Sequence, residues 1–139
     1  MKSFLILLFT IAFAAAIWTP SFTQCGDSSE PFLADHIVFH LENTTLVGAC
    51  GKVTSKGLAT AFHHLDVEGH ADLFGFEARI YYPHVVANGL PFCLNYTADG
   101  AWIGVRNIYV NMSAKNILGK ELGCVNVTLK YSEPKFLDI

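Results

Sequence analysis

The chain has 139 residues, of which 52% are hydrophobic, 13% aromatic and 15% charged, and its formal net charge is −3. This length suits a single domain with one core of its own. The lack of a basic excess argues against a nucleic-acid partner and against electrostatic docking on an anionic membrane. No internal repeat, low-complexity tract or linker divides the sequence, so we expect one domain.

The N-terminal segment has the pattern of a secretory signal peptide. Lys2 gives a positive start, the run from Phe4 to Ile17 is apolar except for Thr10, and Ala14-Ala15-Ala16 ends it. A bilayer needs ~20 helical residues, so the run is too short to span one, although an uncleaved anchor is the alternative. We expect a signal over residues 1–16, cleavage between 16 and 23, and a single exported domain over 17–139.

The remaining sequence predicts strands, because apolar and polar residues alternate with a period of two. In chain order, the expected strands are His36–Leu41, Thr45–Ala49, Leu58–Val67, Leu73–Tyr82, Asn107–Ser113 and Gly123–Tyr131. Gly, Asn and Asp mark turns between them, as in Ala87-Asn88-Gly89, Asp99-Gly100 and Gly119-Lys120. No helix of ten or more residues is indicated. Six to eight short strands favour an antiparallel sandwich or barrel.

The alternation also predicts which side chains face inward. One face of the strand at 73–82 carries Phe74, Phe76, Ala78, Ile80 and Tyr82. The inward residues of the last two strands are Ile108, Val110, Met112, Val125, Val127, Leu129 and Tyr131. This pattern puts Asn111 and Asn126 outside, where a glycosylation acceptor must lie. The four sequons of the chain, and hence its expected glycosylation sites, begin at Asn43, Asn95, Asn111 and Asn126.

Four cysteines follow the signal, namely Cys25, Cys50, Cys93 and Cys124. An even number in an oxidising compartment predicts two disulfides, and four cysteines allow three pairings. None of them has the C-x-x-C spacing of a zinc or redox site.

Catalytic and metal-binding patterns are weak. The six histidines are His36, His40, His63, His64, His70 and His84, and on strands their spacing does not bring them together at one metal ion. We interpret them as surface imidazoles, with a charge that responds to endosomal pH. The sequence contains no G-x-S-x-G and no H-E-x-x-H. Asp66 and Glu68 share a strand face, which is also common for solvated polar residues. We therefore expect no enzyme, no metal and no cofactor.

Two stretches resemble the ML (lipid-recognition) family. The segment Pro20–Gly26, which ends in Cys25-Gly26, is similar to the family's opening after the cleavage site. The segment from Ile108 through Gly119-Lys120 to Cys124 and Leu129 is similar to its last hairpin, where a charged turn precedes a cysteine in the final strand. The resemblance implies a bond between Cys25 and Cys124, which leaves Cys50 with Cys93. Closing a loop of ~100 residues is worth on the order of 4–5 kcal/mol in the chain-entropy model.

The resemblance further implies an all-β, immunoglobulin-like antiparallel sandwich whose two sheets splay at one edge, leaving a cavity for a lipid tail or sterol. The inward residues of the best strands are the candidates for lining this cavity, and two residues in expected loops are candidates for its mouth. In order, the ligand-binding candidates are Phe74, Phe76, Ile80, Tyr82, Phe92, Trp102, Val110, Val127 and Leu129, with Phe92 and Trp102 at the mouth.

The resulting functional prediction is a secreted, non-enzymatic carrier of a lipid or sterol, acting as a monomer outside the cell or in the endosomal or lysosomal lumen. A receptor or an acceptor membrane is an expected partner, and nucleic acid is not. The alternative is a secreted sandwich with a filled core that binds a protein or glycan through its loops. Uptake of a fluorescent fatty acid or sterol distinguishes the two.

Overall fold

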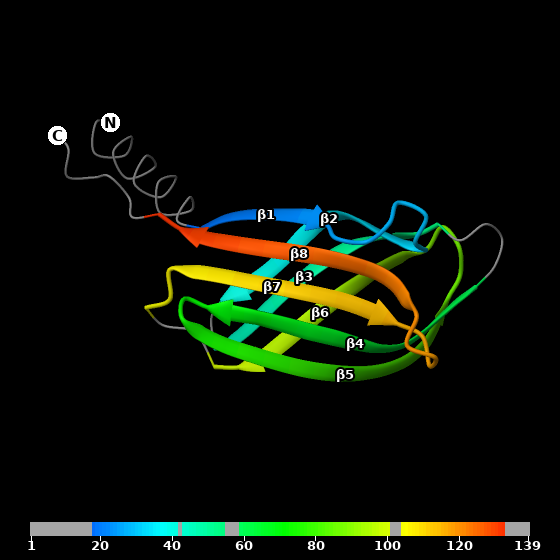
Figure 1. Ribbon diagram of the computed structural model, residues 1–139. Helices are drawn as coiled ribbons and strands as arrows, with labels where there is room; N and C mark the ends of the chain where they lie inside the picture. The colour runs from blue at the N-terminus through cyan, green and yellow to red at the C-terminus, as the bar shows by residue number, and fades with distance from the viewer. Residues whose placement is uncertain (1–17, 42, 55–58, 101–103, 133–139) are drawn as a thin grey trace, which may run out of the picture.

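The secondary structure of the described residues consists of β-strands that form two layers (Figure 1). The computed structural model describes residues 18–41, 43–54, 59–100 and 104–132. In chain order the strands are β1 (Trp18–Gln24), β2 (Phe32–Leu41), β3 (Thr44–Val53), β4 (Thr60–Ala71), β5 (Phe74–Val86), β6 (Pro91–Asp99), β7 (Asn107–Lys115) and β8 (Glu121–Tyr131). No helix in this part of the chain is long and apolar enough to cross a bilayer.

The strands form a five-stranded sheet in the order β1-β8-β7-β4-β5 and a three-stranded sheet in the order β2-β3-β6. All neighbouring strands are antiparallel. Figure 1 shows the three-stranded sheet running obliquely behind the larger one. The predicted all-β sandwich is therefore confirmed.

The core lies between the sheets, as the alternation predicts. Val110 and Met112 of β7 and Val127 and Leu129 of β8 are fully buried, while Asn111 and Asn126 lie on the outer face. The sheets are not equally close along their width. Close Cα approaches between them gather where β1 and β8 meet β2 and β3, and they are sparser where β4 and β5 face the smaller sheet. The sandwich is therefore wider at the side of β5 and β6.

The disulfides join Cys25 to Cys124 and Cys50 to Cys93, which is the pairing that the resemblance implies. Cys25 follows β1 and Cys124 lies in the adjacent β8, while Cys50 and Cys93 are register partners in β3 and β6. Each bond thus links neighbouring strands of a single sheet, and neither bond crosses from one sheet to the other.

Two strands lie outside the predicted set. β1 contains Pro20, and it forms an edge strand, where proline is tolerated because one side of the backbone needs no partner. Its whole length pairs with β8, so a cut as late as Thr23 would remove nearly all of it. β6 was expected to be a loop, yet Phe92, Leu94 and Tyr96 point toward the core in alternation with Cys93 and Asn95.

The turn between β4 and β5 also differs from the prediction. Leu73 was expected to start a strand, but Asp72 and Leu73 form the turn, and Asp72 adopts a positive φ of 53°. The carboxylate of Asp72 accepts hydrogen bonds from the backbone N–H groups of Arg106 and Asn107, which holds this left-handed conformation in place. Phe74, an expected inward residue, is 72% exposed next to this turn.

Candidate functional site

Aromatic side chains fill the wider side of the sandwich. We call Phe62, Phe76, Tyr82, Phe92 and Tyr96 the aromatic seam. They come from β4 and β5 of the large sheet and from β6 of the small one. The rings of Phe62 and Phe92 stack with their centroids 4.5 Å apart, and those of Phe76 and Tyr96 stack at 5.4 Å. Both pairs bridge the two sheets, so aromatic rings contribute to the packing between β5 and β6.

The residues of the seam differ in how deeply they are buried. Phe62 is 2% exposed, whereas Phe76, Tyr82, Phe92 and Tyr96 are only partly buried against the core. β5 and β6 are the edge strands of their sheets on this side, so the partly buried rings lie at the border of the sandwich. The seam therefore connects the interior to solvent through apolar side chains.

Tyr82 carries the polar atom of the seam. Its ring lies against Phe62 and Phe92, with centroid distances of 6.1 and 5.8 Å. Its hydroxyl is buried and has no hydrogen-bond partner among the described residues. Burial raises the pKa of Tyr82 above its ordinary value, so the phenol stays neutral. A buried hydroxyl without a partner is costly, and a ligand oxygen placed there would satisfy it.

The predicted ligand-binding residues fall into separate environments. Phe76, Ile80, Tyr82 and Phe92 are partly buried at the wide side and pack against the core. The deep candidates Val110, Val127 and Leu129 are fully buried in that core. Phe92 lies in a strand rather than a loop, Phe74 is exposed, and Trp102 lies outside the described residues. Sequence reasoning missed Phe62 and Tyr96, although both sit at inward positions of alternating runs.

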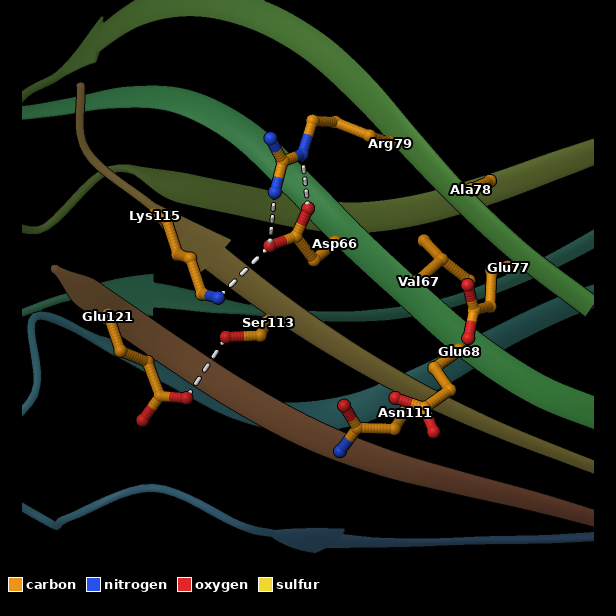
Figure 2. A pocket seen from close by; sticks show the side chains of 10 residues that line it. All are labelled: Asp66, Val67, Glu68, Glu77, Ala78, Arg79, Asn111, Ser113, Lys115 and Glu121. Carbon is orange, nitrogen blue, oxygen red and sulfur yellow. Dashed lines mark hydrogen bonds and ion pairs between the residues drawn. The ribbon is translucent and has the colours of Figure 1, made fainter. Parts of the chain in front are cut away.

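A polar groove of about 670 Å³ lies on the outer face of the five-stranded sheet (Figure 2). Asp66 is at its centre and accepts hydrogen bonds from Nε and Nη2 of Arg79 at 2.7 and 3.2 Å, while Nζ of Lys115 lies 3.0 Å away. The hydrogen bond from Arg79 is the largest cause that lowers the pKa of Asp66 to about 2. Glu68 and Glu77 face each other across β4 and β5 in the same groove. Asp66 therefore holds the cationic side chains of Arg79 and Lys115 in place.

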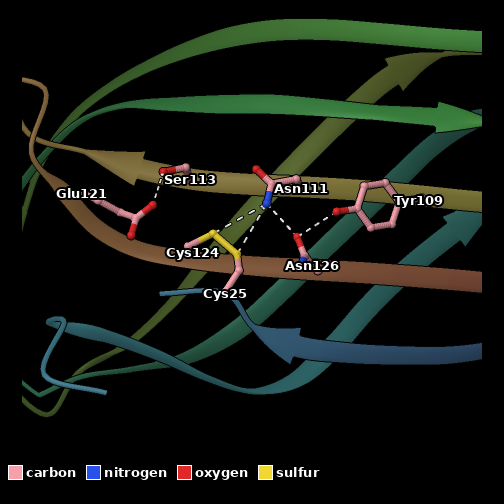
Figure 3. The surroundings of a disulfide bond; sticks show 7 residues. All are labelled: Cys25, Tyr109, Asn111, Ser113, Glu121, Cys124 and Asn126. Atoms are coloured by element: carbon pink, nitrogen blue, oxygen red, sulfur yellow. Dashed lines mark hydrogen bonds between the residues drawn. A yellow bond between two sulfur atoms is a disulfide. The ribbon is translucent and has the colours of Figure 1, made fainter. Parts of the chain in front are cut away.

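The Cys25–Cys124 disulfide joins the end of β1 to β8 beside two sequon asparagines (Figure 3). Nδ2 of Asn111 donates to Oδ1 of Asn126 at 2.6 Å and lies 3.4 and 3.6 Å from the two sulfur atoms. The hydroxyl of Tyr109 donates to the same Oδ1 at 3.2 Å. The predicted outer-face position of both asparagines is confirmed, but both are half-buried.

The histidines do not form one cluster. Nδ1 of His63 and Nδ1 of His64 lie 2.9 Å apart, so one of these nitrogens donates and the other accepts. His64 is 7% exposed, and burial lowers its pKa, so the expectation of a surface imidazole is wrong for this residue. His36 contacts Asp35, and His70 stacks on Tyr109. Within the described ranges, no group of three or more His, Cys, Asp or Glu residues is placed to hold a metal ion.

No family model and no curated protein matches the sequence. Among solved structures, chicken MD-1 complexed with lipid IVa matches with a TM-score of 0.45 and 10% identity, covering 84% of this chain and 91% of that one. A Niemann-Pick type C2 protein from Japanese carpenter ant matches with a TM-score of 0.45 and 8% identity, covering 78% and 96%. Both are ML-domain proteins, the family that the sequence resembles.

Proposed function

We propose that the chain is a secreted, non-enzymatic carrier that takes a lipid or sterol between its two sheets, entering along the aromatic seam. The observation that carries this proposal is the seam itself, which places partly buried rings at the wide side of the sandwich and includes Tyr82, whose buried hydroxyl has no partner among the described residues. The four sequons, the two disulfides and the N-terminal segment support export to an oxidising compartment.

The seam suits an apolar guest. Transfer of apolar surface out of water is worth about 25 cal/mol per Å², so burying ~300 Å² of a ligand contributes roughly 7–8 kcal/mol, on the order of micromolar affinity before ordering costs. Partly buried rings such as Phe76 and Tyr96 offer apolar surface against which a chain or a fused ring system would pack. The deep aliphatic residues Val110, Val127 and Leu129 would form the floor of the site.

Tyr82 would give the site its polar preference. A sterol hydroxyl or a fatty-acid carboxyl carries one small polar head on a large apolar body, which matches one buried hydroxyl among rings. The same phenol is a poor nucleophile, because its raised pKa keeps it protonated. These side chains therefore suit non-covalent binding rather than a covalent reaction.

The test is uptake of dehydroergosterol and of a fluorescent fatty acid by the purified chain, together with mass spectrometry of organic extracts from the natively isolated protein. We expect saturable uptake that Phe76→Asp reduces at least tenfold. The matched control is Phe74→Asp, two residues earlier on β5 but 72% exposed, which should leave uptake unchanged.

Circular dichroism must show that both variants keep their β structure. Absence of uptake by the wild-type chain would overturn the proposal and favour a sandwich that binds a protein or glycan through its loops. Equal loss in the two variants would also contradict a site at the seam.

A further inference from the structure

An aliphatic surface is exposed at the end of the five-stranded sheet opposite the β4–β5 turn. Ile117 and Leu118, in the turn between β7 and β8, are 75% and 88% exposed, and Val85 near the end of β5 is 71% exposed. We call these three residues the aliphatic tip. Together with Ala61 and Pro83, they line a groove of about 380 Å³.

The turn that carries the tip is held in shape by its own hydrogen bonds. Oδ1 of Asn116 accepts the N–H groups of Leu118 and Lys120 at 3.0 and 2.9 Å. The backbone N–H of Asn116 donates to the carbonyl of Lys120, and Gly119 provides the positive φ of 83° that the turn requires. Ile117 and Leu118 are therefore presented to solvent by a closed turn rather than by a loose loop.

The charged groups near the tip are of both signs. Lys115 and Lys120 flank the turn, and His63 and His84 line the groove. None of the described residues that line the groove is acidic. The nearby carboxylate of Asp66 already holds Arg79 and Lys115. Glu121 follows Lys120 and is the register partner of Lys115, so Lys120 is the cation that the turn itself adds beside the aliphatic residues.

We propose that the aliphatic tip docks on a phospholipid bilayer, with Ile117 and Leu118 inserted among the acyl chains and Lys120 near the headgroup phosphates. Exposed aliphatic residues next to a lysine suit an interfacial membrane anchor, because the apolar side chains enter the acyl region and the ammonium group stays among the headgroups. A second copy of the chain suits the tip less well, because three side chains expose far less than the ~800 Å² per partner of a stable interface. The proposal rests on the proposed function in one respect, since a lipid carrier must reach the membranes that hold its cargo.

The experiment is vesicle flotation with the full chain, using phosphatidylcholine vesicles with and without 20% phosphatidylserine. We expect binding to both compositions, tighter with phosphatidylserine. The double variant Ile117→Asp/Leu118→Asp should weaken binding at least tenfold, and Lys120→Glu should abolish the advantage of phosphatidylserine. Leu73→Asp is the matched control, since Leu73 is 102% exposed in the turn at the opposite end of the sheet.

Absence of wild-type flotation, or an equal loss in Leu73→Asp, would overturn the proposal. So would light scattering that shows a wild-type dimer lost in the double variant, because the tip would then bind a second copy. Uptake of dehydroergosterol in vesicle-free solution is measured in parallel. Flotation without uptake refutes the carrier function alone, and uptake without flotation refutes the docking alone.

Discussion

Asn111 and Asn126 are directly opposed on β7 and β8, and the side-chain amide of Asn111 donates to the side-chain oxygen of Asn126 at 2.6 Å. Both residues begin a glycosylation sequon, and the nitrogen that would carry a glycan on Asn111 is the one engaged in this bond. The same nitrogen faces the sulfur atoms of the Cys25–Cys124 disulfide. A sugar on that atom would disturb these contacts in the folded protein.

This relationship predicts the glycosylation pattern. Asn43 and Asn95 are exposed, so we expect glycans there, none on Asn111, and at most one on the opposed pair. Enzymatic deglycosylation in heavy-oxygen water, followed by peptide mapping, marks each occupied asparagine. Asn95→Gln should remove one glycan from the secreted protein and Asn111→Gln none. A glycan on Asn111 of the folded, secreted protein would contradict the packing around the disulfide.

Tyr82→Phe should increase the stability of the ligand-free protein and weaken its binding of ligands with a hydroxyl group. Removing a buried hydroxyl that lacks a partner should raise the free energy of unfolding by about 1 kcal/mol, because an unsatisfied group of this kind costs ~1–3 kcal/mol. The variant should bind a sterol with a free hydroxyl several-fold more weakly, and the same sterol lacking the hydroxyl equally well. Urea unfolding and fluorescence titration provide the two measurements. Parallel changes for both sterols would show that Tyr82 acts through shape alone.

Glu30 should make stability depend on pH. Burial and the neighbouring carboxylate of Glu121 raise the pKa of Glu30 to about 7, from an ordinary value of 4.5. The folded state therefore binds more protons than the unfolded chain between these values. The contribution of Glu30 to the free energy of unfolding is on the order of 1 kcal/mol after solvent screening. This contribution is complete below pH 4.5 and is lost as the pH rises through 7. Urea midpoints between pH 4.5 and 7.5 should fall less in Glu30→Gln than in the wild type.

A slope unchanged in Glu30→Gln would place the pH dependence on another group. The predicted direction favours stability at lumenal acidity, where the proposed carrier would also work.

Replacing Cys25 and Cys124 together by serine should lower the free energy of unfolding by about 4–5 kcal/mol, since the bond closes a loop with a sequence separation of 99. The separation of 43 for Cys50 and Cys93 gives about 4 kcal/mol in the same model. The first variant should also free β1 for proteolysis, because its anchor to β8 is lost. Urea unfolding and limited proteolysis check the two statements. Protection of β1 in the serine variant would show that pairing with β8 is sufficient by itself.

Period-two alternation predicts the long strands and their inner faces, because one buried face imposes it on the sequence directly. It identified Val110, Val127 and Leu129 as inward residues and Asn111 and Asn126 as outward ones. It failed at β1, where Pro20 interrupts a short run, and at Phe74, where the turn at Asp72 and Leu73 leaves the ring outside the sandwich. Alternation therefore predicts the middle of a strand well, but it does not show where the strand ends.

The candidate site was harder to predict, because it depends on which strands of the two sheets face each other. Phe62 stacks on Phe92, and Phe76 on Tyr96, across the gap between the sheets. Nothing in the alternation of either strand fixes these partners, since period two sets a face but not the position of the opposite layer. The missing partner of the Tyr82 hydroxyl is likewise a property of the assembled interior.

The placement of the two disulfides has a mechanical consequence. Both cross-links stiffen a layer from within, one holding β1 to β8 and the other β3 to β6, while the layers themselves meet through side chains and connecting loops. Each sheet is cross-linked internally, and no disulfide joins one sheet to the other. At the side of β5 and β6 no disulfide joins the sheets, and the chain itself connects them there through residues 87–90.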